Sequence, residues 1–421
     1  MAAILLKNIS VGDARRDVLI ESGIIKRIED AGSCSGWDLA GDLESMDCEG
    51  KVAVPGFVNM HVHAAMSLLR GVGEDMRFHD WLSHVWKIEA KIDPEFIFHG
   101  ARVACIEMIR AGTTTFSDMY WHSQETRRAA IEMGLRPALG YTLMDNFDPR
   151  KAAVEKENAE KDYELYKDSP VYVLSCHSIY TVSADTLCWA SSFARRHGIP
   201  LHIHLSETRK EVADCKEAHG GLTPVEYLDS LGILGPEMIA GHSLWLTEND
   251  VRLLGAAGVS CVHNINSNAK LASGYRFLYK ELREAGANVC LGTDGCASSN
   301  NLDILEAMKN AALFQKAWRD DPSALPLDEL MNMATVNGAG ALGLNAGRIA
   351  VGALADLSIV DTDNSFFLSP APFAANFVYS AHSDCIDSLI CAGKFVMRHR
   401  EVRGEKEILD EARKVLARIM E

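Results

Sequence analysis

Basic residues are in short supply along this chain. Its 421 residues include 42 lysines and arginines against 58 aspartates and glutamates, which gives a formal net charge of −16 at pH 7. No block of lysine or arginine interrupts this acidity. Nucleic acids and anionic membranes are therefore not expected as partners, because both attract basic surfaces.

Long apolar runs and paired cysteine motifs are also missing. No run approaches the roughly 18 apolar residues that cross a bilayer, and the apolar start before Lys7 is too short for a signal-peptide core. The 11 cysteines are odd in number, and no two are spaced as Cys-x-x-Cys. This usage predicts reduced thiols in a cytoplasmic protein.

Repeats, low-complexity tracts and proline-rich linkers are absent as well, and what remains has a globular composition. Hydrophobic residues make up 48% of the chain and charged residues 24%, so a large buried core is available and disorder is excluded.

The middle of the chain alternates short apolar segments with longer helical patterns, as in parallel α/β proteins. Clear helical patterns cover 94–111, 185–197 and 301–319, the last with Asn300 or Asn301 as its expected N-cap. Eight candidate strands favour a closed (β/α)8 TIM barrel. These strands span 52–63, 112–119, 136–144, 171–177, 200–205, 238–242, 259–263 and 288–294.

The two chain ends have a different texture, with brief β runs broken by glycine. We predict that residues 1–53 and 347–421 together form a small β-sandwich domain, and that 54–346 form the barrel. Apolar residues at helical spacing between Glu405 and Met420 predict a C-terminal amphipathic helix.

Polar side chains end most of the predicted barrel strands, on the face where barrels build active sites. His61 and His63 alternate on one strand, so both imidazoles can face one metal ion. A third imidazole and a carboxylate such as Asp294 would complete a site for a divalent ion.

The third imidazole is ambiguous from spacing alone, because parity places His202 and His204 on the same side of their strand. Glu207 follows just beyond this strand, where a carboxyl group can act as a general acid. His242 ends another strand, and strand-end histidines of this kind are more often structural than catalytic.

Several ordered motifs resemble the amidohydrolase superfamily. Within it, the chain looks like the subgroup of S-adenosylhomocysteine, methylthioadenosine and 5′-deoxyadenosine deaminases and triazine hydrolases. The likeness extends from the N-terminal strands to about residue 400. Its motifs are Pro55-Gly-Phe-Val-Asn-Met-His-Val-His63, His63-Ala-Ala-Met-Ser-Leu-Leu-Arg-Gly71, His204-Leu-Ser-Glu207, Gly241-His242, His263-Asn-Ile-Asn-Ser-Asn-Ala-Lys-Leu271 and Gly292-Thr-Asp-Gly-Cys-Ala-Ser-Ser-Asn300.

The resemblance implies a homo-oligomer and one divalent metal ion, usually zinc and sometimes iron. The ligands of this ion would be His61, His63, His204 and Asp294, and the resemblance thus favours His204 over His202. Glu207 takes the proton-shuttle position, and His242 the position that holds the reacting water or the developing oxyanion. Asp294 would accept a proton from the attacking water, and Glu207 would protonate N1 of an adenine ring.

The resemblance also implies a purine nucleoside substrate. Glu89 matches a glutamate that accepts hydrogen bonds from both ribose hydroxyls, and His177 matches a histidine that contacts the purine. Tyr141 stands where homologues that bind the homocysteine carboxylate carry arginine, and Arg150 aligns uncertainly with a second arginine. We therefore rank 5′-deoxyadenosine and methylthioadenosine at least level with S-adenosylhomocysteine, with adenosine as a further candidate.

Two other readings remain open. The same scaffold could deaminate guanine or a pterin, or dehalogenate a triazine, although Glu89 with His177 favours a ribosyl purine. A non-catalytic scaffold would not need the four ligand positions, and all four are present.

Overall fold

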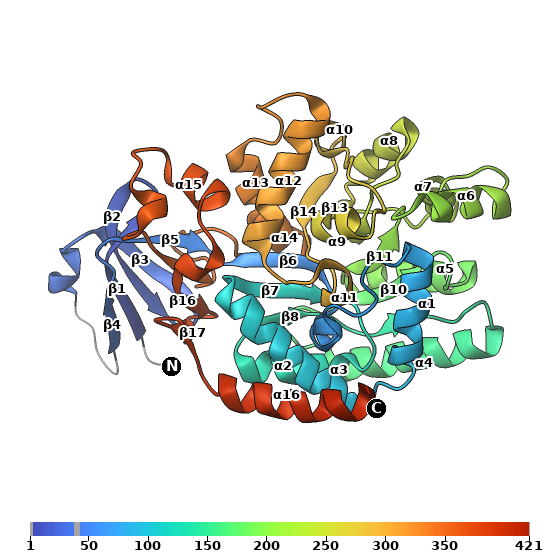
Figure 1. The fold of residues 1–421 in the computed structure, drawn as a ribbon, viewed down its shortest axis with the longest axis horizontal. Coiled ribbons are helices and arrows are strands. Elements are labelled where there is room, and N and C mark those ends of the chain that lie inside the picture. Colours follow the sequence, from blue (N-terminus) through green and yellow to red (C-terminus); the bar gives the residue numbers. More distant parts are fainter. Residues whose placement is uncertain (1–2, 38–42, 421) are drawn as a thin grey trace.

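The structure, a computed structural model, describes residues 3–37 and 43–420. It combines a sheet drawn from both chain ends with a larger α/β part (Figure 1). Residues 1–2, 38–42 and 421, which fall in the predicted terminal segments, lie outside the described residues.

Both chain ends contribute strands to one nine-stranded sheet, where the sequence predicts a small β-sandwich. Its order is β18-β17-β16-β15-β5-β1-β2-β3, and β4 pairs with β1. The two ends meet where β15 runs antiparallel to β5. The strands are β1 (Ala3–Val11), β2 (Ala14–Glu21), β3 (Ile24–Asp30), β4 (Leu43–Asp47), β5 (Lys51–Pro55), β15 (Leu357–Asp361), β16 (Ile386–Cys391), β17 (Lys394–Arg398) and β18 (Glu401–Val402).

The α/β part contains two parallel sheets, β6-β7-β8 and β14-β13-β12-β11-β10-β9. Beyond β14, the backbone N–H of Asp294 donates to the carbonyl of His61 at 2.9 Å, so the last strand lies beside the first. The strands are β6 (Phe57–Val62), β7 (Thr113–Asp118), β8 (Arg136–Ala138), β9 (Thr142–Leu143), β10 (Leu174–Ser178), β11 (Leu201–Leu205), β12 (Met238–His242), β13 (Ser260–His263) and β14 (Asn288–Leu291).

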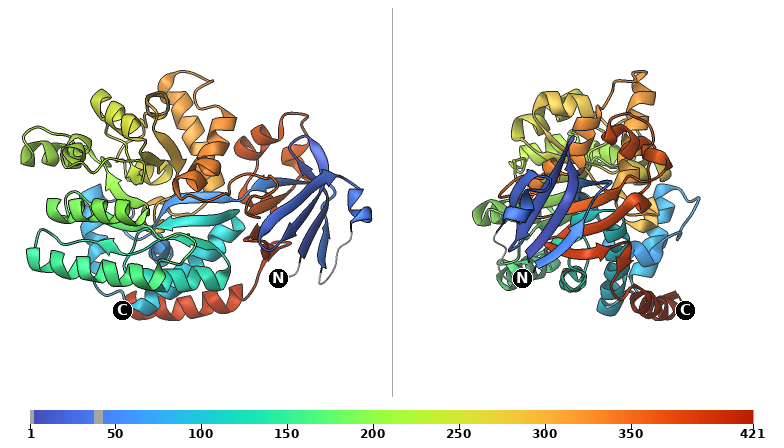
Figure 2. Two further views of the ribbon diagram at one scale, coloured as in Figure 1. Left: turned by 180° about the vertical axis from the view of Figure 1, so that it is seen from behind. Right: turned by 90° about the vertical axis from the view of Figure 1, so that its left-hand side faces the viewer.

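Helices surround these parallel strands (Figures 1 and 2). They are α1 (Phe78–Glu89), α2 (Pro94–Arg110), α3 (Ser123–Met133), α4 (Pro149–Tyr166), α5 (Ala184–His197), α6 (Arg209–Ala218), α7 (Pro224–Ser230), α8 (Glu248–Ala257), α9 (Ile265–Lys270), α10 (Tyr279–Ala285), α11 (Cys296–Ser299), α12 (Ile304–Arg319), α13 (Leu327–Ala334), α14 (Val336–Ala341), α15 (Phe373–Tyr379) and α16 (Glu405–Met420), with short 3-10 turns at Ser33–Gly36, Ala64–Leu69, Ser365–Phe367 and Ser383–Cys385. In the described part of the chain no helix is long and apolar enough to span a membrane.

Three sequence predictions need correction. The segment 136–144 is two strands in different sheets, β8 and β9, and between them the chain passes so close to Tyr172 at Gly140 that a Cβ there would lie 2.5 Å from the ring. The segment 52–63 is likewise two strands in different sheets, β5 and β6, separated at Gly56. Helix α12 begins after Asp303, whose carboxylate accepts from the backbone N–H groups of Leu305 and Glu306, so neither Asn300 nor Asn301 is its N-cap.

Two contacts tie the chain ends to the α/β part. Helix α16 packs along α2, burying Ile408 and Ile419, and Figure 2 shows it running beneath the α/β part. Arg136 on β8 pairs with Asp356, which precedes β15, and both side chains are buried.

The domain boundaries at residues 53 and 346 stay predictions. All 11 cysteines are free thiols.

Candidate metal centre and substrate cavity

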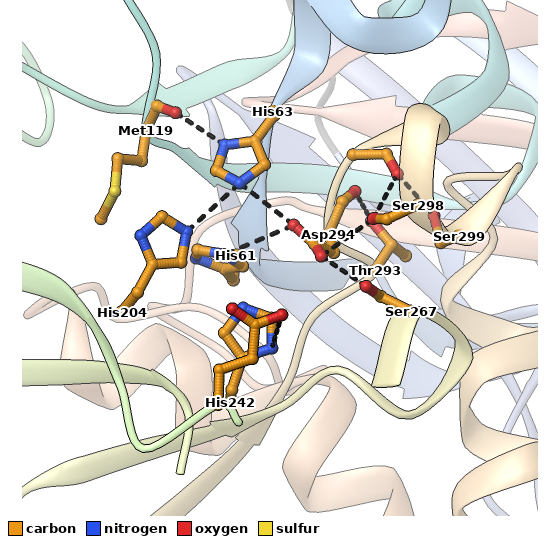
Figure 3. A network of polar contacts seen from close by, with 12 residues as sticks. His61, His63, Met119, His204, His242, Ser267, Thr293, Asp294, Ser298 and Ser299 are labelled. Atoms are coloured by element: carbon orange, nitrogen blue, oxygen red, sulfur yellow. Dashed lines mark hydrogen bonds and ion pairs between the residues drawn. The ribbon is translucent and has the colours of Figure 1, made fainter. Parts of the chain in front are cut away.

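Side chains from the ends of four parallel strands converge at one point of the α/β part. His61 lies on β6, His63 directly after it, His204 on β11 and His242 on β12. Asp294 follows β14, and its backbone hydrogen bond to His61 brings its carboxylate back over the strand ends. Figure 3 shows these five side chains pointing toward one another.

The donor atoms lie close enough to share one ion. Asp294 Oδ1 is 3.1 Å from His63 Nε2 and 3.5 Å from His61 Nε2, and His63 Nε2 is 3.3 Å from His204 Nε2. Two overlapping groups, His61 with His63 and Asp294 and His61 with His204 and His242, each keep their ligand atoms within 4.8 Å. The structure thus brings together all four predicted ligands.

The other ring nitrogens of the three predicted imidazole ligands are occupied. Nδ1–H of His63 donates to the Met119 carbonyl and Nδ1–H of His204 to the His177 carbonyl, both at 2.7 Å. His61 Nδ1 lies 2.9 Å from Nε2 of His202. These partners leave Nε2 of each ligand available, which is what a metal ion requires of a neutral imidazole.

The charge distribution also suits a cation. Burial disfavours the charged form of Asp294, but the neighbouring imidazoles of His61 and His63 outweigh it and hold the pKa of Asp294 well below its usual range. Burial likewise opposes charge on His63, yet Asp294 raises the pKa of His63 to about 9. Without an ion, the ionised Asp294 carboxylate is therefore paired with a protonated His63, and a divalent metal would take the place of that proton.

A second oxygen keeps the Asp294 carboxylate in place. Its Oδ2 accepts from Ser267 Oγ at 2.6 Å and from Ser298 Oγ at 2.9 Å, while Oδ1 faces the histidines (Figure 3). The same motif that carries Asp294 thus also supplies one of the two hydroxyls that orient it.

The backbone at the strand ends is left-handed at four positions. Ser206, His242, Ser243 and Asp294 have φ angles of 52°, 68°, 46° and 64°. L-residues adopt this region rarely, and such residues concentrate where a site demands a particular backbone path. Here the path turns the chain inward directly beside the histidines.

Glu207 lines the cavity next to the converging ligands. Burial raises its pKa to about 8, with a further contribution from the nearby charge of Asp294. At neutral pH the carboxyl group is therefore mostly protonated and can donate a proton.

Glu211, on the first turn of α6, holds the peptide that carries Glu207. Its two carboxylate oxygens accept from the backbone N–H groups of Ser206 and Glu207, each at 2.7 Å. The sequence analysis missed this residue. The pattern Thr208-x-x-Glu211 signals a helix N-terminus, but the carboxylate bonds to residues before the cap instead of the cap itself.

His242 is oriented by Asn268, another residue that the sequence analysis did not single out. His242 Nδ1–H donates to Asn268 Oδ1 at 2.9 Å, and burial lowers the pKa of His242. The ring is therefore neutral, with its unprotonated Nε2 acting as an acceptor. An acceptor suits a role in holding a water molecule better than one in stabilising an oxyanion.

The cavity extends from the metal centre past the two predicted substrate contacts, Glu89 and His177. Glu89 is buried and accepts a hydrogen bond from the Tyr120 hydroxyl, and burial raises its pKa. His177 donates through Nδ1 toward Thr181 Oγ1 at 2.8 Å, and burial lowers its pKa to about 4. Trp81, Trp86 and Met66 also line this cavity.

A second cavity continues outward from Glu89 and shares Tyr120 and Thr142 with the first. Tyr141 lines it, together with Lys151 and the half-buried Glu155, whose Oε2 accepts from the Met144 backbone N–H at 3.2 Å. Arg150 does not belong to it, since its side chain is 94% exposed and faces Asp148.

Comparisons with known proteins point in one direction. The sequence pattern of the Amidohydrolase family matches residues 52–396. The chain is 42% identical to a 5′-deoxyadenosine deaminase of Methanoregula boonei, over 99% of this chain and 95% of that protein. It is 40% identical to 5-methylthioadenosine/S-adenosylhomocysteine deaminase 1 of Archaeoglobus fulgidus, over 89% of this chain and 90% of that protein.

Solved structures agree on the fold. An adenosine deaminase from Xanthomonas campestris with bound zinc superposes with a TM-score of 0.92 at 30% identity, over 100% of this chain and 98% of that one. An atrazine chlorohydrolase from Arthrobacter aurescens, complexed with zinc, gives a TM-score of 0.89 at 20% identity, over 98% of this chain and 100% of that one. The second likeness concerns the fold alone.

Proposed function

Because this chain belongs to the amidohydrolase family, we propose that it is a metal-dependent deaminase that hydrolyses 5′-modified adenosines to the corresponding inosines and ammonia. The observation that carries the proposal is the convergence of three imidazoles and one carboxylate beside Glu207 in one cavity. Relatives named as deaminases of such nucleosides, at about 40% identity, support the substrate class.

His61, His63, His204 and Asp294 would hold the ion. Zinc is our first candidate, supported by the zinc in the Xanthomonas structure, and iron is the second, because imidazoles with a carboxylate suit both metals. When bound, the ion would lower the pKa of water toward about 7, making hydroxide available near neutral pH.

The remaining chemistry belongs to side chains of this protein. In our proposal Asp294 accepts a proton from the water that adds to C6 of the adenine ring, and His242 orients that water through its unprotonated Nε2. Glu207 donates its proton to the ring nitrogen N1. Asp294 then passes the proton it accepted to the amino group, and the C6–N bond breaks as ammonia leaves. The added hydroxyl gives its proton back to Glu207, so C6 becomes the carbonyl of inosine.

Glu89 and His177 would bind the nucleoside. A buried carboxylate can accept hydrogen bonds from two vicinal ribose hydroxyls, and a neutral imidazole can exchange a hydrogen bond with a purine nitrogen. The outer cavity beside Tyr141 and Glu155 would receive the 5′ substituent. A carboxylate tail would meet Glu155 there without an arginine to pair with, while Lys151 is the available cation.

Ammonia release from a panel of 5′-modified adenosines tests the proposal. We expect Glu207→Gln to lower kcat by about 100- to 10,000-fold while retaining the metal, because an amide cannot donate the catalytic proton. The matched control is Glu217→Gln, an exposed residue on α6, which should behave as the parent does. Near-normal turnover by Glu207→Gln would remove its assigned role.

The same panel tests the substrate ranking. We expect 5′-deoxyadenosine and methylthioadenosine to have kcat/KM values at least equal to that of S-adenosylhomocysteine. A preference of more than about tenfold for S-adenosylhomocysteine would contradict this ranking.

A cytoplasmic location is a further proposal, supported by the free thiols. Homo-oligomeric assembly stays a prediction.

A further inference from the structure

We propose that His202 and Ser117 are positioning residues that set which nitrogen of the metal ligand His61 carries its proton. This inference rests on the proposed metal-dependent function. His202 Nε2 lies 2.9 Å from His61 Nδ1, and His202 Nδ1 lies 3.2 Å from Ser117 Oγ. All three residues have no exposed surface, so water cannot substitute for any member of this chain of contacts.

The three residues lie on three different parallel strands. His61 lies on β6, Ser117 on the adjacent β7 and His202 on the more distant β11. His202 shares its strand face with the ligand His204, two residues along. It therefore reaches inward beneath the metal centre while His204 reaches the centre itself.

Metal binding requires one particular arrangement of protons. His61 Nε2 is the nitrogen that faces Asp294 Oδ1, and in the described structure it has no hydrogen-bond partner. To bind a cation this nitrogen must be unprotonated, so the proton of the neutral ring must sit on Nδ1. That Nδ1–H then donates to His202 Nε2, and His202 in turn donates through its own Nδ1–H to Ser117 Oγ.

The reverse arrangement of protons prevents metal binding. If the Ser117 hydroxyl donates to His202 Nδ1, the proton of His202 moves to Nε2 and donates to His61 Nδ1. The proton of His61 must then sit on Nε2, which leaves that nitrogen without a lone pair for a metal ion. A hydroxyl can donate or accept, so both arrangements satisfy the contacts of His202 with His61 and Ser117, and only one of them leaves a lone pair on His61 Nε2 for a metal ion.

The other two imidazole ligands have no such choice. His63 and His204 each donate to a backbone carbonyl, which can only accept, so in the neutral form of either ring the proton sits on Nδ1 and the lone pair on Nε2. His61 is thus the ligand whose metal-binding form depends on side chains behind it. Residues of this kind typically change metal affinity by about 10- to 100-fold when replaced.

The experiment compares zinc affinity, measured by competition with a chelator, across matched variants. We expect Ser117→Ala and His202→Phe to bind zinc about 10- to 100-fold more weakly than the parent. Ser175→Ala is the control, because Ser175 is a buried serine paired with His202 in the strand register, and its hydroxyl has no partner within the described residues. It should bind zinc as the parent does.

A conservative variant separates hydrogen bonding from packing. The side-chain oxygen of His202→Gln can still accept from His61 Nδ1–H, so this variant should bind zinc more tightly than His202→Phe. Equal affinities of these two variants would count against the proposal. Thermal unfolding of each metal-free protein reports whether the variant folds, and Ser117→Ala, which removes one oxygen atom, is the mildest change.

Nitrogen-15 spectra of the zinc-loaded parent, labelled at histidine, read the proton positions directly. We expect His61 and His202 each to carry the proton on Nδ1, and a proton on Nε2 of His202 would overturn the proposal. The two levels of inference fail differently. A parent that binds no zinc would refute the proposed function, whereas a parent that binds zinc no better than Ser117→Ala and His202→Phe would refute the positioning role alone.

Discussion

At the scale of single residues, Glu211 shows how a side chain outside the reacting atoms can determine their placement. Each of its oxygens accepts one backbone N–H, from Ser206 and from Glu207. In Glu211→Gln one of these N–H groups faces an amide NH2, and an unsatisfied buried donor costs about 1–3 kcal/mol. We expect kcat to fall by about 10- to 100-fold, since the displaced peptide carries Glu207.

Steady-state kinetics and metal analysis check this prediction. Zinc content should be unchanged, because no ligand is altered, and KM should change less than kcat. Glu226→Gln is a suitable control: Glu226 closes a capping box on α7, where glutamine serves nearly as well. If Glu211→Gln kept full turnover, the peptide would not need the carboxylate to hold its position.

At the scale of helices and strands, the C-terminal helix α16 was predictable from its apolar spacing alone. It buries Ile408 against the α/β part of the chain. Ile408→Ala should lower the free energy of unfolding by about 2–5 kcal/mol, because it leaves a cavity in a packed interface. Urea denaturation measures the loss, and the exposed Lys414→Ala should stay within about 0.5 kcal/mol of the parent. Equal stability of the two variants would show that α16 packs only loosely.

Strand periodicity also predicted much of the candidate site. Alternation placed His61 and His63 on one face, and strand ends located His204, His242 and Asp294, all of which the structure brings together. Parity could not separate His202 from His204, because both share a face. The family resemblance favoured His204. In the structure His204 Nε2 lies 3.3 Å from His63 Nε2, whereas His202 Nε2 lies 2.9 Å from Nδ1 of His61, the nitrogen that does not face Asp294.

Other features lay beyond a reading of the sequence for similar reasons. Ser117 and Asn268 each bond to a histidine side chain far along the sequence, and Glu211 bonds to two backbone N–H groups in an irregular loop. No periodic pattern marks such partners. Where 136–144 divides into two strands, the ring of Tyr172, some 30 residues away, packs against Gly140. Local propensity carries no information on a contact of that kind.

At the scale of the whole molecule, one buried ion pair joins the sheet from the chain ends to the α/β part. Arg136 Nη2 donates to Asp356 Oδ1 at 3.2 Å, and that oxygen also accepts from the Ala392 backbone N–H at 2.7 Å. Arg136→Met leaves a buried carboxylate without its cation, so we expect a loss of about 3–5 kcal/mol of unfolding free energy.

The double variant Arg136→Met with Asp356→Leu separates charge from connection. It removes both charges, so its loss should be smaller than that of Arg136→Met alone. Chemical denaturation followed by circular dichroism provides the comparison. A double variant at least as unstable as the single one would mean that the pair contributes through its hydrogen bonds to the backbone, above all the one from Ala392.

The left-handed backbone at Ser206, His242 and Asp294 has an evolutionary consequence. Each such residue costs about 1–3 kcal/mol, and glycine would relieve most of that cost at Ser206. Selection for heat tolerance alone should therefore favour changes at these positions, whereas selection for turnover should oppose them. Homologues that adapt to higher temperatures would have to gain thermal stability at other positions of the chain. Homologues no longer under selection for activity would lose it fastest, by substitutions at these positions.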